Sequence, residues 1–475
     1  MYYYNYTKLR CLGPVNRGGI YERIFIGNLV QPHIEDDMVT NAPFPPQPLP
    51  KGAKATKELL KYVPQLSLKE RDRRWDGIRK TMMMANIDVL LFLGNDAFWD
   101  MGMVNLRYVT QVGSKLGAHA LFFIDRNPII WNALPHMNRP TNMHLSIQEW
   151  VQDCRVFGGV PAVAAAIREA DLPKGRIGLV GFGSTIVTTP TFLHGDVVNY
   201  RKELPDFEFV DANWIIEQMR LIKSEEEIGM LVKASTIARK TVDTLIEYSK
   251  PGVTEAQLYA EMVRTQIANG AEPQIFQLLS SGPVEHPGTE LWHLLHGAEQ
   301  PIVPTMRPLQ KGDLVMSEFH TQYSGYLAAT EFTVYVGKRA PPQLLNIHKA
   351  CVAALEASLE ALVPGNTLQH AWEAIRRPVE KAGMDFVELG FHGHGLASPE
   401  FPTVVYRPGF GSDSMNGARI GHLVFEEGMV FGNNIDVFDP RWKPDVGCMF
   451  GDMVVVRKGG AQRLVNVPLE LPQNG

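Results

Sequence analysis

The chain has 475 residues, more than one ordinary domain needs, so two domains are the first expectation. Its 45% hydrophobic and 20% charged residues are typical of a globular protein and exclude disorder over most of its length. Because 46 Lys and Arg face 51 Asp and Glu, the net charge is −5, and no basic block favours nucleic acid or an anionic membrane as a partner.

The spacing of the cysteines and the length of the apolar runs indicate the cellular compartment. Cys11, Cys154, Cys351 and Cys448 lie far apart, which argues against a disulfide framework or a thiolate zinc site. The first residues contain no apolar core of signal-peptide length, and no uncharged apolar run is long enough to span a bilayer. We therefore predict a cytoplasmic protein.

Residues 1–60 are predicted to be an extension or linker, because clustered prolines near their end favour extended backbone. A helix is expected over 67–87, and a buried strand over 87–94. Further apolar runs of strand length follow at 105–111, 119–125, 128–133, 176–182 and 207–212, with a helix at 160–172. Strands that alternate with helices predict a mixed or parallel sheet, so 61–218 is expected to be an α/β domain.

A second domain is predicted over 219–475. Ser224 and Glu227 form a capping box at the start of a long helix, and Thr254 can cap the next one. A strand pair with its turn at 323–325 follows, then two helices within 341–383, and then strands at 390–401, 428–438 and 451–459. Two helices followed by strands thus occur twice, which indicates an internal pseudo-duplication.

The predicted strand pair carries the first group of candidate site residues. Strand alternation places Glu318 and His320 on one face of the first strand and Glu331 on a face of the second. If these faces meet, an imidazole and two carboxyl groups share one cavity, where burial is costly unless they are paired. The alternative is a solvent-facing hairpin that carries ordinary charges.

Histidines supply two further groups. His392 and His394 share a face among glycines, which allow a ligand to approach the backbone closely. Metal ligation with Glu400 or the carboxylates of the strand pair is one interpretation, and a neutral hydrogen-bonded imidazole or a general base is another. The Gly- and Pro-rich loop that follows residue 281 adds three more histidines, most of which are expected to be merely exposed: His286, His293 and His296.

The order of short motifs resembles that of the creatinase/aminopeptidase P superfamily. The motifs are R-x-x-K-S-x-x-E-I at 220–228, Ser281-Gly282, GDLV…GY at 312–326, GHG at 393–395, GMVF at 428–431 and GDMVVV at 451–456. The resemblance implies a C-terminal pita-bread domain, with two helix pairs over a curved antiparallel sheet and pseudo-twofold symmetry. It also implies a smaller α/β domain of the creatinase type before it.

The resemblance also implies where a two-metal centre of the superfamily would lie. Its five ligand positions fall on Glu318, Ala329, His394, Asn434 and Gly451. Alanine and glycine have no ligand atom, and an amide is a poor bridging ligand, so we expect no metal and no cofactor. A single ion held by Glu318, Glu331, His320 and His394 is the alternative.

Creatinase and ectoine hydrolase resemble the chain in type, since a substrate-binding Glu of creatinase matches Glu331. Some likeness extends to the dimethylsulfoniopropionate lyase branch. By this resemblance we predict catalytic roles for His296 or His293, with His394, Glu331 and Glu318. Substrate-binding roles are predicted for His320, His286, His392, Asn434 and Glu400.

The predicted function is a metal-independent enzyme that hydrolyses an activated C–N bond of a small molecule, with a His as general base and Glu residues that orient the substrate. A lyase on a small, possibly aromatic substrate is the first alternative. A metal-dependent Xaa-Pro-type peptidase and a non-catalytic binding protein are the others. The resemblance also implies a homodimer.

Overall fold

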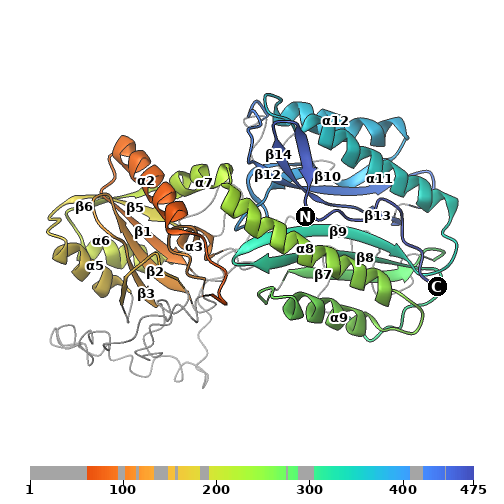
Figure 1. The fold of residues 1–475 in the computed structure, drawn as a ribbon, viewed down its shortest axis with the longest axis horizontal. Coiled ribbons are helices and arrows are strands. Elements are labelled where there is room, and N and C mark those ends of the chain that lie inside the picture. The colour runs from red at the N-terminus through yellow and green to blue at the C-terminus, as the bar shows by residue number, and fades with distance from the viewer. Residues whose placement is uncertain are drawn as a thin grey trace, which may run out of the picture. The chain divides into compact units, whose positions relative to one another are not determined.

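The computed structural model describes most of the chain after its first sixty residues. The described ranges are 61–94, 102–113, 117–132, 148–155, 159–181, 192–273, 276–286, 304–406, 421–443 and 445–475. The predicted extension at 1–60 lies outside them. Figure 1 shows the fold.

Residues 89–211 form a six-stranded mixed sheet in the order β4-β3-β2-β1-β5-β6. Its strands are β1 Val89–Gly94, β2 Ala118–Phe123, β3 Ile129–Asn132, β4 Asp153–Arg155, β5 Gly175–Val180 and β6 Phe207–Asp211. The helices of this part are α2 Leu68–Ala85, α3 Val104–Thr110, α5 Val160–Glu169, α6 His194–Glu203 and α7 Asn213–Leu221. Strand β1 is buried throughout and pairs antiparallel with β2 and parallel with β5, so the predicted mixed sheet is present.

The strand predicted over 105–111 is wrong, because these residues form the helix α3. The run is apolar and only seven residues long, so its pattern fits a helix as well as a strand. Gln111 ends the helix in a left-handed conformation at φ 59°, and its N–H donates to the Arg107 carbonyl. Burial of Leu106, Tyr108 and Val109 selects the compact helical form.

The second part repeats one order of elements. Helices α8 Glu225–Tyr248 and α9 Glu255–Ala268 precede the sheet of β7 Gln277–Pro283, β8 Asp313–Tyr323 and β9 Tyr326–Tyr335. Helices α11 Pro342–Ala361 and α12 Leu368–Lys381 precede the second sheet. Its strands are β10 Asp385–Gly393, β11 Glu400–Tyr406, β12 Val430–Phe438, β13 Gly447–Met449, β14 Met453–Arg457 and β15 Gly460–Arg463. The predicted duplicated order is therefore present, although β7 was not predicted.

The run 390–401, predicted as one strand, is instead two strands with a break at 394–399. Pro399 lies in the break, where it has no N–H to donate to a sheet. A Cβ on Gly395 would lie 2.5 Å from Oε1 of Glu400, so the chain there passes close to a buried carboxylate. The break therefore turns the backbone around the side chain of Glu400.

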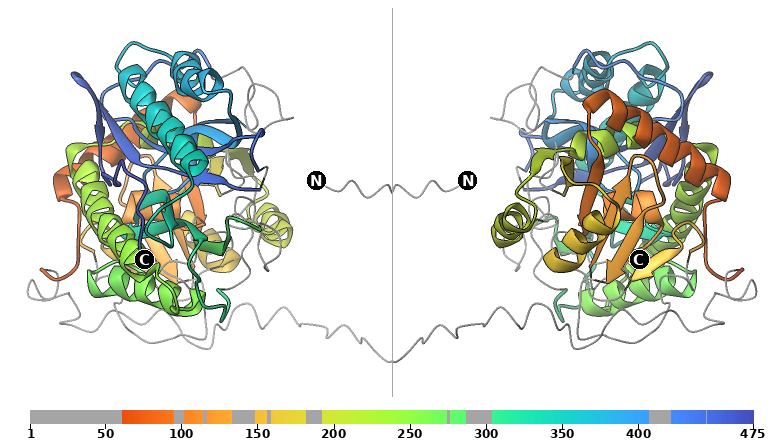
Figure 2. Two further views of the ribbon diagram at one scale, coloured as in Figure 1. Left: turned by 90° about the vertical axis from the view of Figure 1, so that its right-hand side faces the viewer. Right: turned by 90° about the vertical axis from the view of Figure 1, so that its left-hand side faces the viewer.

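The two sheets of this part are joined directly. Thr330 Oγ1 on β9 donates to the carbonyl of Gly451 over 2.7 Å, and Gly451 N–H donates to the carbonyl of Glu331 over 2.9 Å. Thr333 Oγ1 donates to the Met449 carbonyl over 2.9 Å. In Figure 1 the strands lie between α8 and α9 on one side and α11 and α12 on the other, and Figure 2 shows the same layers from two further sides.

No helix within the described ranges is long and apolar enough to cross a membrane.

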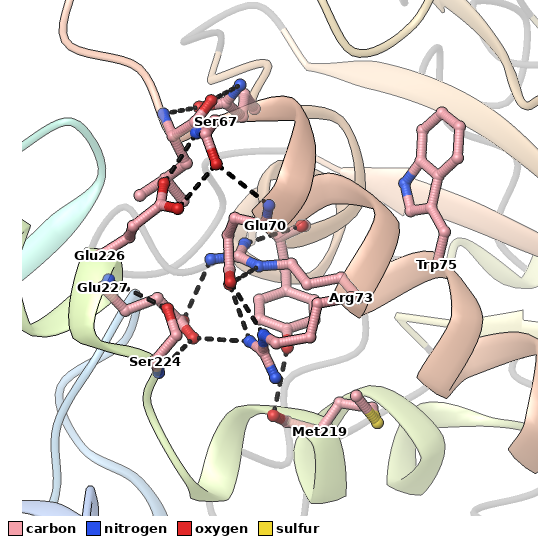
Figure 3. A network of polar contacts seen from close by, with 12 residues as sticks. Ser67, Glu70, Arg73, Trp75, Met219, Ser224, Glu226 and Glu227 are labelled. Atoms are coloured by element: carbon pink, nitrogen blue, oxygen red, sulfur yellow. Dashed lines mark hydrogen bonds and ion pairs between the residues drawn. The ribbon is translucent and has the colours of Figure 1, made fainter.

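A buried ion network ties α2 to α8 and to the turn of the β8–β9 hairpin (Figure 3). Arg74, 1% exposed, contacts Glu70 at 2.7 Å and Glu227 at 3.2 Å. Its Nη2 donates to the hydroxyl of Tyr326 over 2.7 Å, and that hydroxyl donates to Glu227 over 3.1 Å. The guanidinium therefore neutralises two buried carboxylates from different elements.

We expect Arg74→Met to lower the free energy of unfolding by about 3–5 kcal/mol, because Glu70 and Glu227 would be left buried with less compensation. Arg264→Met is the control, since its pair with Glu261 is at the surface and its loss should lower the free energy of unfolding much less. Urea unfolding of both variants gives the two values. Equal losses would show that the network does not stabilise the fold.

Candidate functional site

The β8–β9 hairpin carries the acidic side of the candidate site. Glu318 lies directly opposite Glu331, and His320 lies opposite Ala329. Residues that face each other across an antiparallel pair project to the same side of the sheet. The predicted convergence of Glu318, His320 and Glu331 on one face is therefore present, and Glu331 is 3% exposed.

Asn434 on β12 connects this hairpin to β10. Its Nδ2 donates to Glu331 Oε1 over 2.9 Å and to Glu388 Oε1 over 3.1 Å. The backbone N–H of Ile435 donates to Glu331 Oε2 over 3.4 Å. Asp436 lies opposite Glu388 in the β10–β12 pair. One amide group thus holds two carboxyl groups from different sheets.

The surroundings of Glu331 decide its protonation. Burial raises the pKa of Glu331 well above its usual range, and the neighbouring Asp436, Glu318 and Glu388 raise it further. The surroundings of Glu331 therefore favour the protonated form of its carboxyl group, which can donate a proton. Strand alternation from His392 would have indicated Glu388, and from Asn434 it would have indicated Asp436, but the sequence reasoning missed both.

Three buried histidines lie beside the carboxyl groups. The rings of His392 and His394 stack with centroids 4.6 Å apart, and His320 stacks on Phe276 at 4.2 Å. His394 Nε2 lies 3.3 Å from the hydroxyl of Ser398. The Nδ1 atoms of His320 and His394 have no hydrogen-bond partner among the described residues.

These imidazoles are neutral near pH 7. Burial lowers the pKa of His320 to about 3 and that of His392 to about 4. Burial also lowers the pKa of His394 well below its usual value, and the neighbouring His392, His320 and Lys223 lower it further. A neutral imidazole can accept a proton, so proton acceptors lie beside the carboxyl group of Glu331.

Glu400 lies on the other side of the histidines, 6% exposed, in ion pairs with Arg220 and Lys223. Burial alone would raise the pKa of Glu400, but Lys223 and Arg220 lower it, so the group is ionised. Sequence reasoning used Arg220 and Lys223 only as part of a family motif and missed their place at the site.

The loop histidines are the remaining predicted site residues. His286 is exposed at the end of the β7 segment and is not brought to the carboxyl cluster by any contact described above. His293 and His296, the predicted bases, lie outside the described residues. Glu318, His320 and Glu331 on the hairpin, Asn434, the His392–His394 pair and Glu400 are thus the predicted groups that the structure brings together.

The side chains present do not fit a pair of bridged metal ions. A Cβ on Gly451 would lie 2.5 Å from the carbonyl oxygen of Asn433, so backbone occupies the space that a ligand side chain would need. The Nδ2 group of Asn434 faces Glu331 and Glu388. It presents hydrogen-bond donors to them, whereas a metal ligand would have to present lone pairs. Across the described ranges, no group of three or more His, Cys, Asp or Glu is arranged to hold an ion.

Comparison with known proteins places this site in a family. Residues 230–458 match the model of metallopeptidase family M24. The matched segment is thus similar to the metallopeptidases of this family. The matched segment contains the hairpin, the histidines and Asn434, so the resemblance to the creatinase/aminopeptidase P superfamily is confirmed.

The chain covers only part of the length of the curated relatives that it matches. The probable dipeptidase PepE of Mycobacterium tuberculosis is 28% identical over 264 residues, which are 55% of this chain and 62% of that protein. The Xaa-Pro dipeptidase of Pyrococcus furiosus is 27% identical over 284 residues, 59% of this chain and 73% of that protein. The ectoine hydrolase of Halomonas elongata is 25% identical over 275 residues, 57% of this chain and 64% of that protein.

Solved structures show that the fold is shared with a prolidase and an Xaa-Pro dipeptidase. The prolidase of Pyrococcus horikoshii has a TM-score of 0.63 at 21% identity, with 83% of this chain and 99% of that chain covered. An Xaa-Pro dipeptidase of Bacillus anthracis has a TM-score of 0.64 at 20% identity, with 85% and 99% covered. The predicted pita-bread fold agrees with these neighbours.

The predicted function needs correction. A metal-independent hydrolase or lyase is contradicted, because the matching model describes a metallopeptidase family and the relatives include dipeptidases and Xaa-Pro dipeptidases. The prediction relied on the side chains at Ala329, Asn434 and Gly451. Such substitutions bear on which ions a site can hold, and they do not specify the bond that is cleaved. The peptidase alternative agrees better with the relatives.

We expect Glu331→Gln to become more stable relative to the unchanged protein as pH rises. A carboxyl whose pKa is raised in the folded state contributes stability below its unfolded pKa near 4.5, and this contribution is lost as pH rises toward the folded pKa. The variant has no such group, so the difference in unfolding free energy should grow by up to about 1.4 kcal/mol per pH unit. Urea unfolding between pH 5 and 8 measures it.

Glu360→Gln, at an exposed position of α11, is the control for loss of one carboxyl group. A difference between the Glu331→Gln variant and the unchanged protein that stayed constant from pH 5 to 8 would contradict a neutral Glu331.

Proposed function

We propose that the chain is a hydrolase that cleaves the amide C–N bond of a dipeptide, with Xaa-Pro dipeptides as the first candidates. The relatives named dipeptidase and Xaa-Pro dipeptidase support this substrate class. The observation that supports the proposal is that the segment similar to family M24 holds the buried carboxyl group of Glu331, hydrogen-bonded to Asn434, together with the stacked imidazoles of His392 and His394.

Amide hydrolysis needs a proton acceptor for the attacking water and a proton donor for the departing nitrogen. In this proposal the carboxyl group of Glu331 donates the proton to the leaving nitrogen, and Asn434 holds that group in place through its 2.9 Å hydrogen bond. His392, which is 8% exposed, is the imidazole placed to accept a proton from water. Because the residues do not fit a two-metal centre, no step is assigned to one.

The substrate assay uses the full chain and follows release of free amino acids by chromatography. The panel contains Ala-Pro, Gly-Pro, Ala-Leu and ectoine, each incubated with Mn²⁺ and, in parallel, with a chelator. We expect release from at least one dipeptide in at least one of the two buffers. No release from any dipeptide in either buffer would overturn the proposal.

The Glu331→Gln variant separates the activity of this chain from that of a contaminating peptidase. Loss of the proton donor should lower kcat by about 10²–10⁴-fold, while the circular dichroism spectrum stays unchanged. Equal rates for the variant and the unchanged protein would show that Glu331 takes no part in the reaction.

The homodimer and the cytoplasmic location stay predictions.

A further inference from the structure

The strand pairing beside the site histidines is irregular. In the β10–β11 pair His392 lies opposite Thr403, whereas the next residue, Gly393, lies opposite Glu400. Strand β11 therefore has extra residues at this point, which form a bulge. A bulge bends a strand and redirects the side chains next to it. The direction of the His392 side chain thus depends on where Glu400 is held.

The turn that follows β10 is also built around Glu400. A Cβ on Gly393 would lie 2.7 Å from the carbonyl oxygen of Glu400, and a Cβ on Gly395 would lie 2.5 Å from its Oε1. His394 lies between these two glycines, and its Nε2 is 3.3 Å from the hydroxyl of Ser398 in the same turn. A shift of Glu400 would therefore move the backbone on both sides of His394.

The carboxylate of Glu400 is held by the segment between α7 and α8. Arg220 and Lys223 both pair with it. Lys223 is fixed within the second part of the chain, because its backbone N–H donates to the carbonyl of Gly428 over 3.0 Å. The other contact of Arg220 leads to the first part.

The guanidinium of Arg220 has two fixed points. Its Nη2 donates to Glu400, and its Nη1 donates to Oδ1 of Asn105 in α3 over 2.7 Å. A guanidinium is planar and its N–H groups point in fixed directions, so the bond to Asn105 sets the plane from which Nη2 reaches the carboxylate. Because Arg220 is buried, leaving Nη1 without an acceptor would be costly.

The side chain of Asn105 is itself held in place. Its Nδ2 donates to Oδ1 of Asn213 over 3.5 Å, and the same oxygen accepts the N–H of Gly181, at the end of β5, over 2.7 Å. Val104 and Leu106, on either side of Asn105, are buried in the core. Both ends of the amide are thus in use, and its oxygen is directed away from the first sheet.

We propose that Asn105 is a positioning residue, which aligns His392 and His394 through Arg220 and Glu400. This inference rests on the proposed function for the reaction that these imidazoles serve. Asn105 acts on the bulge and on the turn, and it touches neither imidazole. A displacement of about 1 Å at a reacting group can lower the rate by about 10²-fold, so a remote residue can matter in this way.

Two variants at position 105 separate the acceptor from the rest of the side chain. Asn105→Leu has a similar volume but no acceptor, so the guanidinium of Arg220 loses one of its fixed points. Asn105→Asp keeps an acceptor oxygen and loses only the N–H group that bonds Asn213 over 3.5 Å. Leucine should therefore disturb the site, and aspartate should restore it.

Arg107→Met is the matched control on the same helix. Arg107 pairs with Glu272 at 2.6 Å, so it also joins α3 to the second part of the chain. That contact leads to the turn of the β8–β9 hairpin, where Glu272 accepts the N–H of Gly325 over 2.8 Å, and it does not lead to Glu400. The control therefore measures the effect of a weaker attachment of α3.

The kinetic test uses the dipeptide of the panel that the unchanged protein hydrolyses fastest. Asn105→Leu should lower kcat by about tenfold or more and change KM by less than about twofold. Asn105→Asp and Arg107→Met should keep kcat within about threefold of the unchanged protein. An unchanged kcat in Asn105→Leu, an equal loss in Arg107→Met, or no recovery in Asn105→Asp would overturn the positioning role.

Hydrogen–deuterium exchange of peptides that cover residues 390–402 tests the same role without a substrate. Exchange there should be about fivefold faster or more in Asn105→Leu, because the bulge and the turn open more often, and unchanged in Arg107→Met and Asn105→Asp. This pattern without hydrolysis of any dipeptide would overturn only the proposed function. Unchanged exchange in Asn105→Leu, or equally fast exchange in Arg107→Met, would overturn the positioning role.

Discussion

The amide of Asn434 is the contact on which the candidate site depends. Carboxyl groups that come together in a buried cavity repel one another unless protons or donors compensate. Asn434 supplies both of its N–H groups, one to Glu331 and one to Glu388. With that compensation the β8–β9 hairpin and the β10–β12 pair can meet, while burial and the neighbouring carboxyl groups raise the pKa of Glu331.

The duplicated order of elements explains why the hydrogen-bond donor for the buried carboxyl group of Glu331 comes from the other sheet. Glu331 belongs to the first half and Asn434 to the second, so their hydrogen bond crosses the junction of the halves. The same junction is held by backbone contacts between Glu331 and Gly451, where a side chain would collide with the carbonyl of Asn433. The close approach that excludes a ligand at Gly451 is thus the approach that brings the amide to the carboxyl group.

The parts of this site that follow from strand alternation could be predicted from the sequence. Glu318, His320 and Glu331 share a face because side chains alternate with period two, and the same rule places His392 beside His394 across one glycine. Alternation could not show that the pKa of Glu331 is raised, because that depends on its burial and on Asp436 and Glu388, which reach it only through the tertiary pairing of β10 and β12.

Other features could not be predicted from the local sequence pattern, for different reasons. The segment 105–111 has an apolar run that a helix and a strand satisfy equally, and only its burial on several sides favours α3. The break at 394–399 depends on the position of Glu400, which is held by Arg220 and Lys223, about 180 residues earlier in the chain. Ion pairs at that separation leave no periodic signal in the sequence.

Arg220 also connects the site to the first part of the chain. Its Nη1 hydrogen-bonds Asn105 in α3, and the first turn of α8, which follows Lys223, carries Glu227, which Arg74 neutralises. Since Tyr326 at the hairpin turn joins the same network, the elements that carry Glu331 and those that carry Arg220 are fixed to a common set of side chains. The first part of the chain therefore acts on both charged ends of the site, and loss of Arg74 would disturb the spacing between them as well as the stability of the fold.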